Sequence, residues 1–207
     1  MVEPAQIVTF DDAVAPPGAD PWVDGHGPGT EVAVVDPDPA WPEQAARLLD
    51  TVRAALGDVV TSVEHVGSTS VPGLAAKPII DLVLAVRDPG DEDAYVPALE
   101  DQGFVLTVRE PWWHEHRMLR HHAPRTNLHV HPAGSVEPVR MVLFRDWLRT
   151  HPDDRELYAS AKRAAAAAAT AAGEHVMQYN ARKQAVVRDI YARLFADLGY
   201  PVPPAEA

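Results

Sequence analysis

Residues 64–86, EHVGSTSVPGLAAKPIIDLVLAV, restrict the fold of this chain more than any other stretch. The second half, PIIDLVLAV, is an apolar segment of strand length and is typical of a buried β-strand. Because side chains alternate along a strand, Asp81 shares one face with Ile79, Val83 and Ala85. A carboxylate on an otherwise apolar face costs free energy unless it has partners. The sequence therefore predicts either a structural aspartate that accepts backbone hydrogen bonds or a metal ligand.

A turn of small residues, Gly67-Ser68-Thr69, lies between this strand and an earlier one predicted over residues 59–67. Where a strand leads through such a turn into a helical turn, the backbone N–H groups point outward and bind phosphate oxygens well. Gly67 would let a ligand approach the backbone, and Ser68 and Thr69 would add hydroxyl donors. Lys77 would lie over the anion or cap the turn. An ordinary turn is the alternative, but the spacing to the strand aspartate favours a phosphate site with a metal ligand beside it.

The apolar periodicity of the remaining chain predicts further strands and helices. Strands are predicted near residues 30–35, 61–66 and 79–86, with a hairpin over 112–122 and 126–132. Helices are predicted over 36–57, 91–103, 138–151, from Pro152 onward and over 174–198. Residues 1–30 are rich in Pro, Gly and Asp and predict a flexible or loosely packed extension. A single domain is then expected over 31–199, followed by a frayed tail over 200–207.

Composition excludes several classes of protein. The 207 residues suit one domain, and the absence of cysteine excludes disulfides, thiolate metal sites and cysteine nucleophiles. A cytoplasmic location fits that absence. The net charge of -12 argues against general nucleic-acid binding, which needs a surplus of Lys and Arg. The sequence contains no apolar stretch of membrane-spanning length and no secretory signal pattern, so no membrane association is expected.

Histidines are concentrated in the predicted hairpin. Six of the ten lie within one short region: His114, His116, His121, His122, His129 and His131. Alternation places His129 and His131 on the same face as Asn127, so Asp81, His129 and one or more of His114, His116 or Glu115 would converge if the hairpin lies beside the Asp81 strand. Two imidazoles and one carboxylate can hold a transition metal, and a histidine can act as a general base near neutral pH. The alternative is that most of these histidines are solvated hairpin residues.

The predicted C-terminal helices repeat one arrangement. Tyr158 precedes Lys162 by four residues, and Tyr179 precedes Lys183 by four, so each pair shares a helix face. A ring beside a cation suits a nucleotide, with the ring stacked on a base and the lysine on a phosphate. Arg145 and Arg149 share a face in the same way and would add phosphate contacts. Amphipathic helices with packed tyrosines and solvated lysines are the alternative.

Four segments together resemble the GrpB family, also called UPF0157: HVGSTSVPGLAAKPIIDLVLAV, NLHVHPAGS, LFRDWLRTHPDDRELYASAKR and YNARKQAVV. The likeness covers roughly residues 31 to 197. It implies an α/β (α+β) fold of the nucleotidyltransferase-like type, a small mixed sheet flanked by helices with a helical C-terminal segment. In that superfamily a Gly-Ser turn cradles a triphosphate, an Asp-x-Asp/Glu pair and a third carboxylate bind two Mg²⁺ ions, and a nucleoside monophosphate is transferred with release of pyrophosphate.

The chain departs from this pattern at the metal site. The expected pair reads Asp81-Leu82-Val83, and the strand of the third carboxylate reads Asn127-Leu128-His129-Val130-His131. Magnesium prefers oxygen ligands, whereas imidazole favours transition metals. The expected ligand set is Asp81, His129 and His131, with Mg or a transition metal such as Mn or Zn, and Asp81 and His129 are the expected catalytic residues.

The resulting expectation is a nucleotidyltransferase-like enzyme or enzyme-derived domain. It would bind a nucleotide, such as a nucleoside triphosphate, or another phosphate-bearing small molecule together with a divalent metal, and act on a small-molecule acceptor. One alternative is a metal-dependent enzyme of another class that uses Asp81 and the His129/His131 hairpin, and the other is a non-catalytic nucleotide- or metabolite-binding module. Some members of the family resemble a domain joined to dephospho-coenzyme A kinase, but this sequence contains no kinase P-loop.

Overall fold

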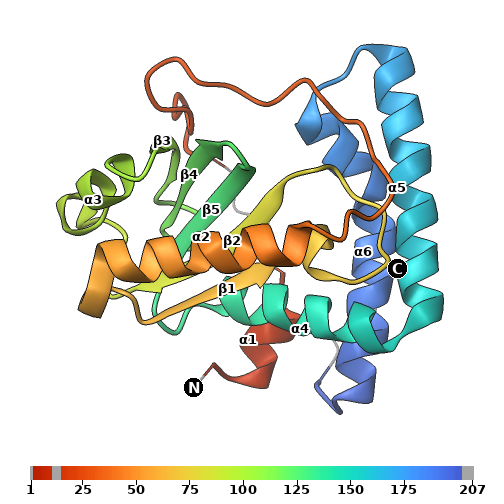
Figure 1. Ribbon diagram of the computed structural model, residues 1–207. Coiled ribbons are helices and arrows are strands. Elements are labelled where there is room, and N and C mark those ends of the chain that lie inside the picture. Colours follow the sequence, from red (N-terminus) through yellow and green to blue (C-terminus); the bar gives the residue numbers. More distant parts are fainter. Residues whose placement is uncertain (1, 11–14, 202–207) are drawn as a thin grey trace.

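A five-stranded mixed sheet forms the centre of the molecule (Figure 1). The computed structural model describes residues 2–10 and 15–201. The strands are β1 (Ser62–Val66), β2 (Ile80–Val86), β3 (Phe104–Glu110), β4 (His116–His122) and β5 (Arg125–Pro132). Their order across the sheet is β1-β2-β5-β4-β3, and only the β2–β5 pair is parallel. The strands β2 and β5 therefore lie next to each other, and they carry the predicted site residues Asp81 and His129.

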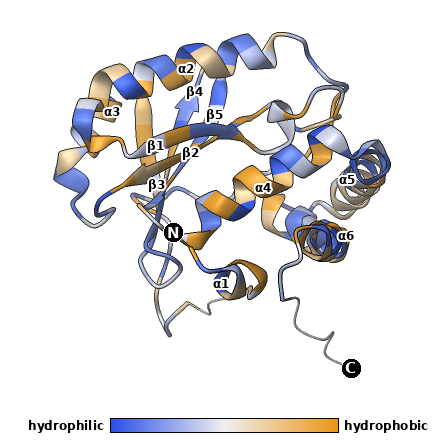
Figure 2. Cartoon of the chain, turned by 90° about the horizontal axis from the view of Figure 1, so that it is seen from below, coloured by the Kyte–Doolittle hydropathy of each residue, from blue (hydrophilic) through white to orange (hydrophobic). Residues whose placement is uncertain are grey.

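Helices cover both faces of the sheet (Figures 1 and 2). One face packs against α2 (Trp41–Leu56) and α3 (Val96–Glu100), and the other faces α4 (Val136–Thr150), α5 (Pro152–Ala172) and α6 (Val176–Asp197). Three short 3₁₀ helices, η1 (Gly57–Val59), η2 (Ser68–Ser70) and η3 (Glu92–Ala94), occupy turns. None of the helices among the described residues is both long and apolar enough to cross a membrane.

The main core lies between α2 and the sheet. The helix buries a stripe at spacings of three and four residues, which is the spacing of one helix face: Trp41, Ala45, Leu48, Val52 and Leu56. Opposite them, alternate residues of the central strands point to the same core, including Leu82, Leu84, Leu128 and Val130. The intervening residues of these strands, among them Asp81 and His129, therefore point to the opposite face, toward the C-terminal helices.

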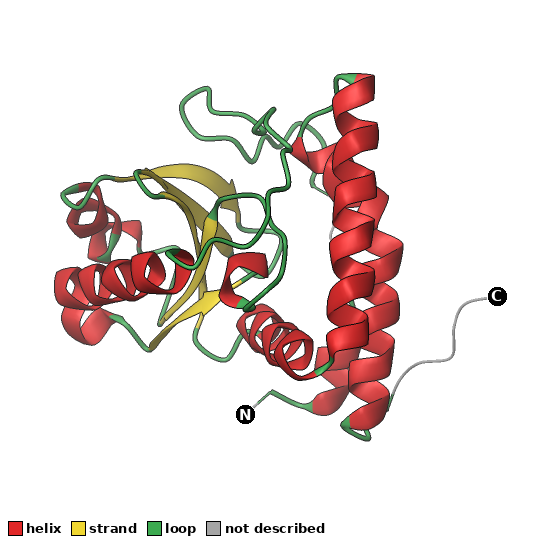
Figure 3. Ribbon diagram, turned by 45° about the vertical axis from the view of Figure 1, so that its right-hand side comes forward, coloured by secondary structure: helices red, strands yellow, loops and turns green. Residues whose placement is uncertain are grey.

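The C-terminal helices form a separate layer (Figure 3). The long helices α5 and α6 lie side by side and are joined at Gly173, whose φ of 67° ends α5 in the left-handed conformation. Close packing uses the alanine run of α5, where Ala165, Ala166 and Ala169 are buried against Tyr179. Asp154 and Arg193 join the other ends of the two helices, with Oδ1 and Nη2 2.6 Å apart. This layer presents a rigid wall to the sheet.

The structure confirms the α/β class with a mixed sheet and C-terminal helices, but three local predictions were wrong. Residues 104–110 form the edge strand β3, which the periodicity analysis did not assign. The helix expected over 91–103 is reduced to η3 and the five-residue α3. The strand expected at 30–35 makes only one bridge, between Val35 and Ala76. These segments depend on tertiary neighbours more than on their own periodicity.

The described part of the N-terminal extension contacts the domain at two places, although residues 15–18, 20 and 24–26 are exposed. Helix α1 (Pro4–Val8) buries Ile7 and Val8 against apolar side chains of α6. Farther along, Trp22 pairs with Val108 of β3, and the chain then crosses to α5 and α6 (Figure 1). The apolar face of α6 would otherwise be exposed, which is why the extension packs there. Residues 11–14 and 202–207, including most of the expected tail, lie outside the described residues.

Arg140 of α4 fixes this extension. Its guanidinium is 2% exposed and donates to the carbonyls of Ile7 and Gln6, each at 2.8 Å, and to that of Thr9. The remaining side of the guanidinium pairs with Glu137. A buried cation with this many acceptors holds α1 against α4 through hydrogen bonds that need the charge.

Replacing Arg140 by alanine is expected to lower the free energy of unfolding by about 3–5 kcal/mol, because it leaves a buried carboxylate and three carbonyls without a donor. Urea denaturation would measure the loss. The matched control is Arg47→Ala on α2, whose ion pair with Glu43 is exposed and should contribute less than about 1 kcal/mol. Equal losses in the two variants would contradict this role for Arg140.

Candidate functional site

A cavity of about 730 Å³ separates the sheet from α5 and α6. Its floor and one wall come from the face of the sheet that carries the polar residues of β2, β5 and β4, and the other wall comes from the two helices. The N-terminal segment contributes Pro21, Trp22, Gly29 and Glu31 to the lining. Of the residues predicted from the sequence, the cavity brings together Gly67, Ser68, Lys77, Asp81, His129, Tyr158, Lys162, Tyr179 and Lys183.

Asp81 lies at the centre of the sheet wall. The parallel register pairs it with Asn127 on β5, and the antiparallel register pairs it with Val66 on β1. The amide Nδ2 of Asn127 donates to Asp81 Oδ1 at 2.9 Å. This bond orients the carboxylate and leaves Oδ2 directed toward the Gly67 turn, so Asp81 has a polar partner but keeps part of its acceptor capacity.

Gly67 is required by both its conformation and its surroundings. Its φ of 68° and ψ of −172° fall in a region that is essentially restricted to glycine. A Cβ atom at this position would lie 2.5 Å from Asp81 Oδ2 and 2.8 Å from Asp81 Cβ. The bare backbone therefore lets the carboxylate pack against the turn, and the two features that the sequence marked are in direct contact.

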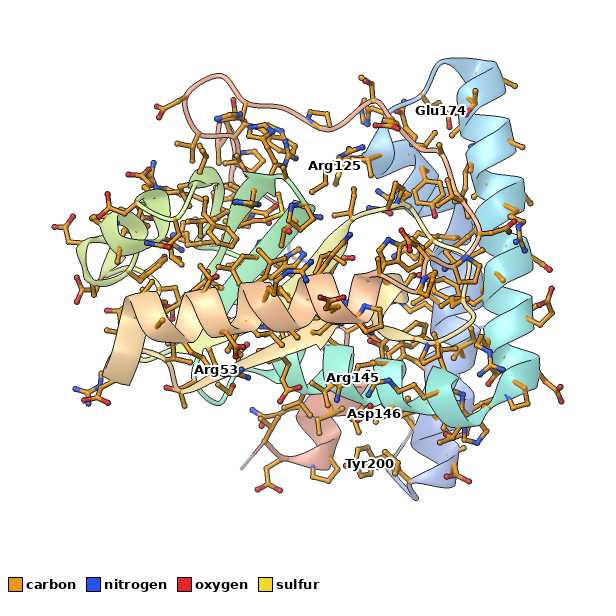
Figure 4. All side chains as sticks on the ribbon, viewed as in Figure 1. Arg53, Arg125, Arg145, Asp146, Glu174 and Tyr200 are labelled. Carbon is orange, nitrogen blue, oxygen red and sulfur yellow. The ribbon has the colours of Figure 1, made fainter. Side chains whose placement is uncertain are left out.

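Thr69 and the two arginines of α4 lie outside the cavity lining, so their phosphate-binding role stays a prediction, and their side chains bond to the protein itself. The Thr69 hydroxyl donates to the Ile79 carbonyl at 3.2 Å. Arg145 donates to the carbonyl of His65 and to Glu64, both at 3.0 Å, and Arg149 donates to the carbonyl of Ser70 at 2.9 and 3.1 Å. Figure 4 shows Arg145 on α4, well apart from Arg125. The two arginines brace the Gly67 turn from behind because its carbonyls point toward α4.

The helical wall is a cluster of lysines and tyrosines. The Nζ of Lys162 lies 4.5 Å from the ring centre of Tyr158, and that of Lys183 lies 5.4 Å from the ring centre of Tyr179. Lys77 approaches the Tyr179 ring from the loop before β2, at 5.2 Å. The rings are only 7% and 2% exposed, so they support the ammonium groups by cation–π contact instead of presenting a free face to a base. The stacking expected from the sequence is replaced by three neighbouring cations.

Burial makes the charged form of two of these lysines less stable relative to the neutral form. It lowers the pKa of Lys162 to about 7, with the charges of Lys183 and Arg163 lowering it further. Burial also lowers the pKa of Lys77 to about 8, and Asp81 opposes this shift. The Lys162 ammonium group donates to the carbonyl of Ala75. Uncompensated cations of this kind gain most from an anionic ligand, because the ligand restores the favourable partner that burial removed.

Histidines of β4 and β5 form a hydrogen-bonded chain with Glu110. His116 Nδ1 lies 2.7 Å from Glu110 Oε2, and His116 Nε2 lies 3.0 Å from His129 Nδ1. All three side chains line the cavity. His131 is fully buried behind them, stacked on His116 at 4.9 Å, and does not line it. His114 and Glu115 occupy the turn before β4 with positive φ and do not join the chain.

The structure does not fit the expected three-residue metal set of Asp81, His129 and His131. Among the described residues, no three His, Asp or Glu side chains converge as metal ligands. His129 Nδ1 is taken up by His116, and His131 Nδ1 faces the carbonyl of His114 at 3.4 Å. Alternation along β5 placed both histidines on the correct face but could not show that one of them is covered.

Several cavity residues had no signal in the sequence analysis. Glu110 was missed because β3 was not assigned. Alternation from Phe104 and Leu106, which belong to the α2 core, would also have placed Glu110 on the core side. A register shift between Leu106 and Val108 turns the end of the strand toward the cavity. Arg120 and Arg125 come from the hairpin, where the sequence pattern is dominated by the histidines. Trp22 comes from the extension, and its ring lies 5.4 Å from the Arg120 guanidinium.

Comparison with known proteins gives the family. The family model described as GrpB protein matches residues 31–193. The chain belongs to the GrpB family. This GrpB-family chain is 44% identical over 162 residues to a UPF0157 protein of Halalkalibacterium halodurans, covering 78% of this chain and 82% of the relative. The crystal structure of GrpB from Enterococcus faecalis is similar with a TM-score of 0.69 and 28% identity, covering 81% of this chain and 99% of the other.

A second group of relatives carries a different name. A dephospho-CoA kinase of Mycolicibacterium paratuberculosis is 32% identical over 192 residues, covering 78% of this GrpB-family chain but only 46% of the kinase. A dephospho-CoA kinase of Mycobacterium bovis is 31% identical over 159 residues, covering 62% of this chain and 38% of the kinase. The similarity therefore spans less than half of each of these longer proteins.

Proposed function

We propose that this GrpB-family protein binds a nucleotide or another phosphate-bearing small molecule in the cavity and transfers a nucleotidyl group to a small-molecule acceptor. The observation that carries the proposal is the cluster of Lys77, Lys162 and Lys183 facing Asp81 and the Gly67-Ser68 turn across one cavity. The cluster is cationic although the chain as a whole carries a net charge of -12. Nucleotidyl transfer is the default reaction class of the nucleotidyltransferase-like superfamily that the sequence resembles.

The described residues suit the binding of a polyphosphate. Two of the three ammonium groups lie in a buried setting where an anion interacts more strongly than it does in water. Ser68 supplies a hydroxyl, and the amides at the start of the 3₁₀ turn have no intrahelical acceptor. Arg120 and Arg125 extend the basic lining away from the turn. The cavity volume also lies in the range of small-molecule sites.

Asp81 is the carboxylate that would hold a divalent metal, with phosphate oxygens of the ligand as further ligands. Bound there, the metal would neutralise phosphate charge. The chain's own residues would orient the phosphates with the lysines and fix the carboxylate through Asn127. The names of the longer relatives make dephospho-coenzyme A a second phosphate-bearing ligand to test beside ATP.

Lys183→Ala is expected to weaken ATP binding about 10–100-fold, because one charge-assisted contact contributes about 1.5–3 kcal/mol. Isothermal titration calorimetry with ATP, with and without Mg²⁺, would measure the change. Arg182→Ala is the matched control, since the neighbouring Arg182 also carries one positive charge but pairs with Glu174 on the outer surface. Its effect should stay within about twofold, in keeping with an exposed pair.

Equal losses in the two variants would count against the cavity as the binding site. Turnover is measured separately, as pyrophosphate release from ATP in the presence of a panel of hydroxyl acceptors. Binding of ATP at the cavity without any release would favour the non-catalytic nucleotide-binding module over the enzyme.

A further inference from the structure

The chain of Glu110, His116 and His129 joins three neighbouring strands on the cavity side of the sheet. Glu110 is opposite His116 in the β3–β4 register. His129 is opposite Met118, which lies two residues after His116 and therefore on the same face of β4. The two hydrogen bonds, at 2.7 and 3.0 Å, run from the carboxylate through both nitrogens of His116 to one nitrogen of His129. No hydrogen bond joins His129 Nε2 to another described residue, so this end of the chain is available to a molecule in the cavity.

Hydrogen-bond polarity fixes the tautomers of both rings. An ionised Glu110 can only accept, so His116 carries its proton on Nδ1, and its Nε2 must then accept from His129 Nδ1. His129 Nε2 is left with a lone pair, as a general base requires. Protonation of Glu110 reverses every bond and turns His129 Nε2 into a donor. The chain therefore has two matched states that differ by one proton.

We propose that Glu110, His116 and His129 form a proton relay, in which His129 Nε2 removes the proton of an acceptor hydroxyl and Glu110 stores it. The proposal rests on the proposed function, because that hydroxyl belongs to the acceptor of the nucleotidyl group. The acceptor oxygen forms a bond to the α-phosphorus, and the bond from this phosphorus to the bridging oxygen breaks, with its electron pair leaving on pyrophosphate. The proton moves to His129 Nε2 while the Nδ1 proton of His129 passes to His116, and that of His116 passes to Glu110.

The surroundings favour a proton stored on the carboxylate of Glu110 over a proton that remains on a histidine ring as an imidazolium ion. Burial raises the pKa of Glu110, and it lowers the pKa values of His116 and His129. Asp81 from β2 and Glu137 from α4 oppose the shift of His129, whereas Arg117 and His114 reinforce that of His116. Burial lowers the pKa of the stacked His131 to about 2, so this ring does not compete for the proton.

Nitrogen NMR of the ligand-free protein tests the relay directly. Two-bond ¹H–¹⁵N spectra of histidine-labelled protein, assigned with His129→Gln, should show His129 protonated on Nδ1 at pH 8. On acidification the proton should move to Nε2 while Nδ1 loses its own, with a midpoint shared by the ¹³C carboxyl signal of Glu110. Glu110→Gln should abolish this exchange, with its fold checked by circular dichroism.

An Nε2 proton at pH 8, or an imidazolium signal from His129 on acidification of the wild-type protein, would overturn the relay. An unchanged exchange in Glu110→Gln would overturn it as well, and if that variant does not fold, the wild-type exchange and the Glu110 carboxyl midpoint decide. These spectra need no ligand, so a failure of ATP to bind would count against the proposed function alone. If the wild-type protein releases pyrophosphate, His129→Gln should slow this release about 10²–10⁴-fold at unchanged ATP affinity. An unchanged rate would refute the role of His129 as the general base.

Discussion

Replacing Gly67 by alanine is expected to lower the free energy of unfolding by about 2–4 kcal/mol, from backbone strain and overpacking together. The new Cβ atom would lie 2.5 Å from Asp81 Oδ2, so either the turn or the carboxylate must move. The movement would also disturb the bond between Asp81 and Asn127, which orients the carboxylate in the cavity. ATP affinity should fall with stability, because the turn and the carboxylate shift together.

Gly73→Ala is the matched control for this prediction. Gly73 has a φ of 77°, but a Cβ atom added there would meet no atom within 4 Å beyond its chain neighbours, so alanine adds strain without a clash. Its cost should be about 1 kcal/mol. Urea denaturation of both variants separates the two effects, and Asp81→Ala in the Gly67→Ala background should recover part of the larger loss. Indistinguishable unfolding midpoints for the two alanine variants would show that contact with Asp81 is not what requires glycine.

The elements predicted most accurately are those with a strong local signal. The apolar run of β2 and the helical spacing from Trp41 to Leu56 are visible in the sequence, and both elements form close to where they were expected. The edge strand β3 has a weaker signal, and its position depends on pairing with β4. The five-residue α1 is stabilised by Arg140, which is more than a hundred residues away in sequence, so no local pattern could show it.

The site was predictable to a similar degree. Alternation and helical spacing show which face a side chain occupies, and this was enough to bring Asp81, His129 and Lys162 to one cavity. They do not show which atoms on that face are already bonded. Arg145 shares a helix face with Arg149 as expected, yet both guanidiniums are used by carbonyls behind the turn. Only the structure shows whether an arginine is available to a ligand or is already bonded to the protein's own carbonyls.

The buried Lys162 is expected to lower the stability of the ligand-free protein. Lys162 is 2% exposed, and its ammonium group has a carbonyl partner but no carboxylate in contact. Its pKa is lowered from 10.5 to about 7, which means that the unfolded chain binds this proton more tightly than the folded protein does. Between about pH 7 and 10.5 the unfolded state therefore holds more protons, and the free energy of unfolding should rise with pH. Lys77, with its pKa lowered to about 8, adds to the same slope.

Lys162→Met is expected to stabilise the ligand-free protein by about 1–3 kcal/mol at pH 6–7, because it removes a buried charge while keeping most of the side-chain volume. It should also flatten the rise of stability between pH 7 and 10, leaving the contribution of Lys77. In the same variant ATP affinity should fall about 10-fold or more, since one charge-assisted contact is lost. Urea denaturation and calorimetry, each from pH 6 to 10, would measure the two changes.

In the wild-type protein, the free energy of unfolding and the affinity for ATP should change in opposite directions with pH. As pH rises through this window, Lys162 and Lys77 lose their protons, so the folded protein becomes more stable while its affinity for ATP declines. Burial raises the pKa of Tyr179, so this neighbour does not titrate there. Arg182→Met is the matched control, because Arg182 pairs with Glu174 on the outer surface, away from Lys162 and Lys77, and should leave both slopes unchanged. A Lys162→Met protein that is less stable than wild type at pH 6–7, or that keeps the full pH slope of ATP affinity, would show that this buried ammonium group is structural and does not serve the ligand.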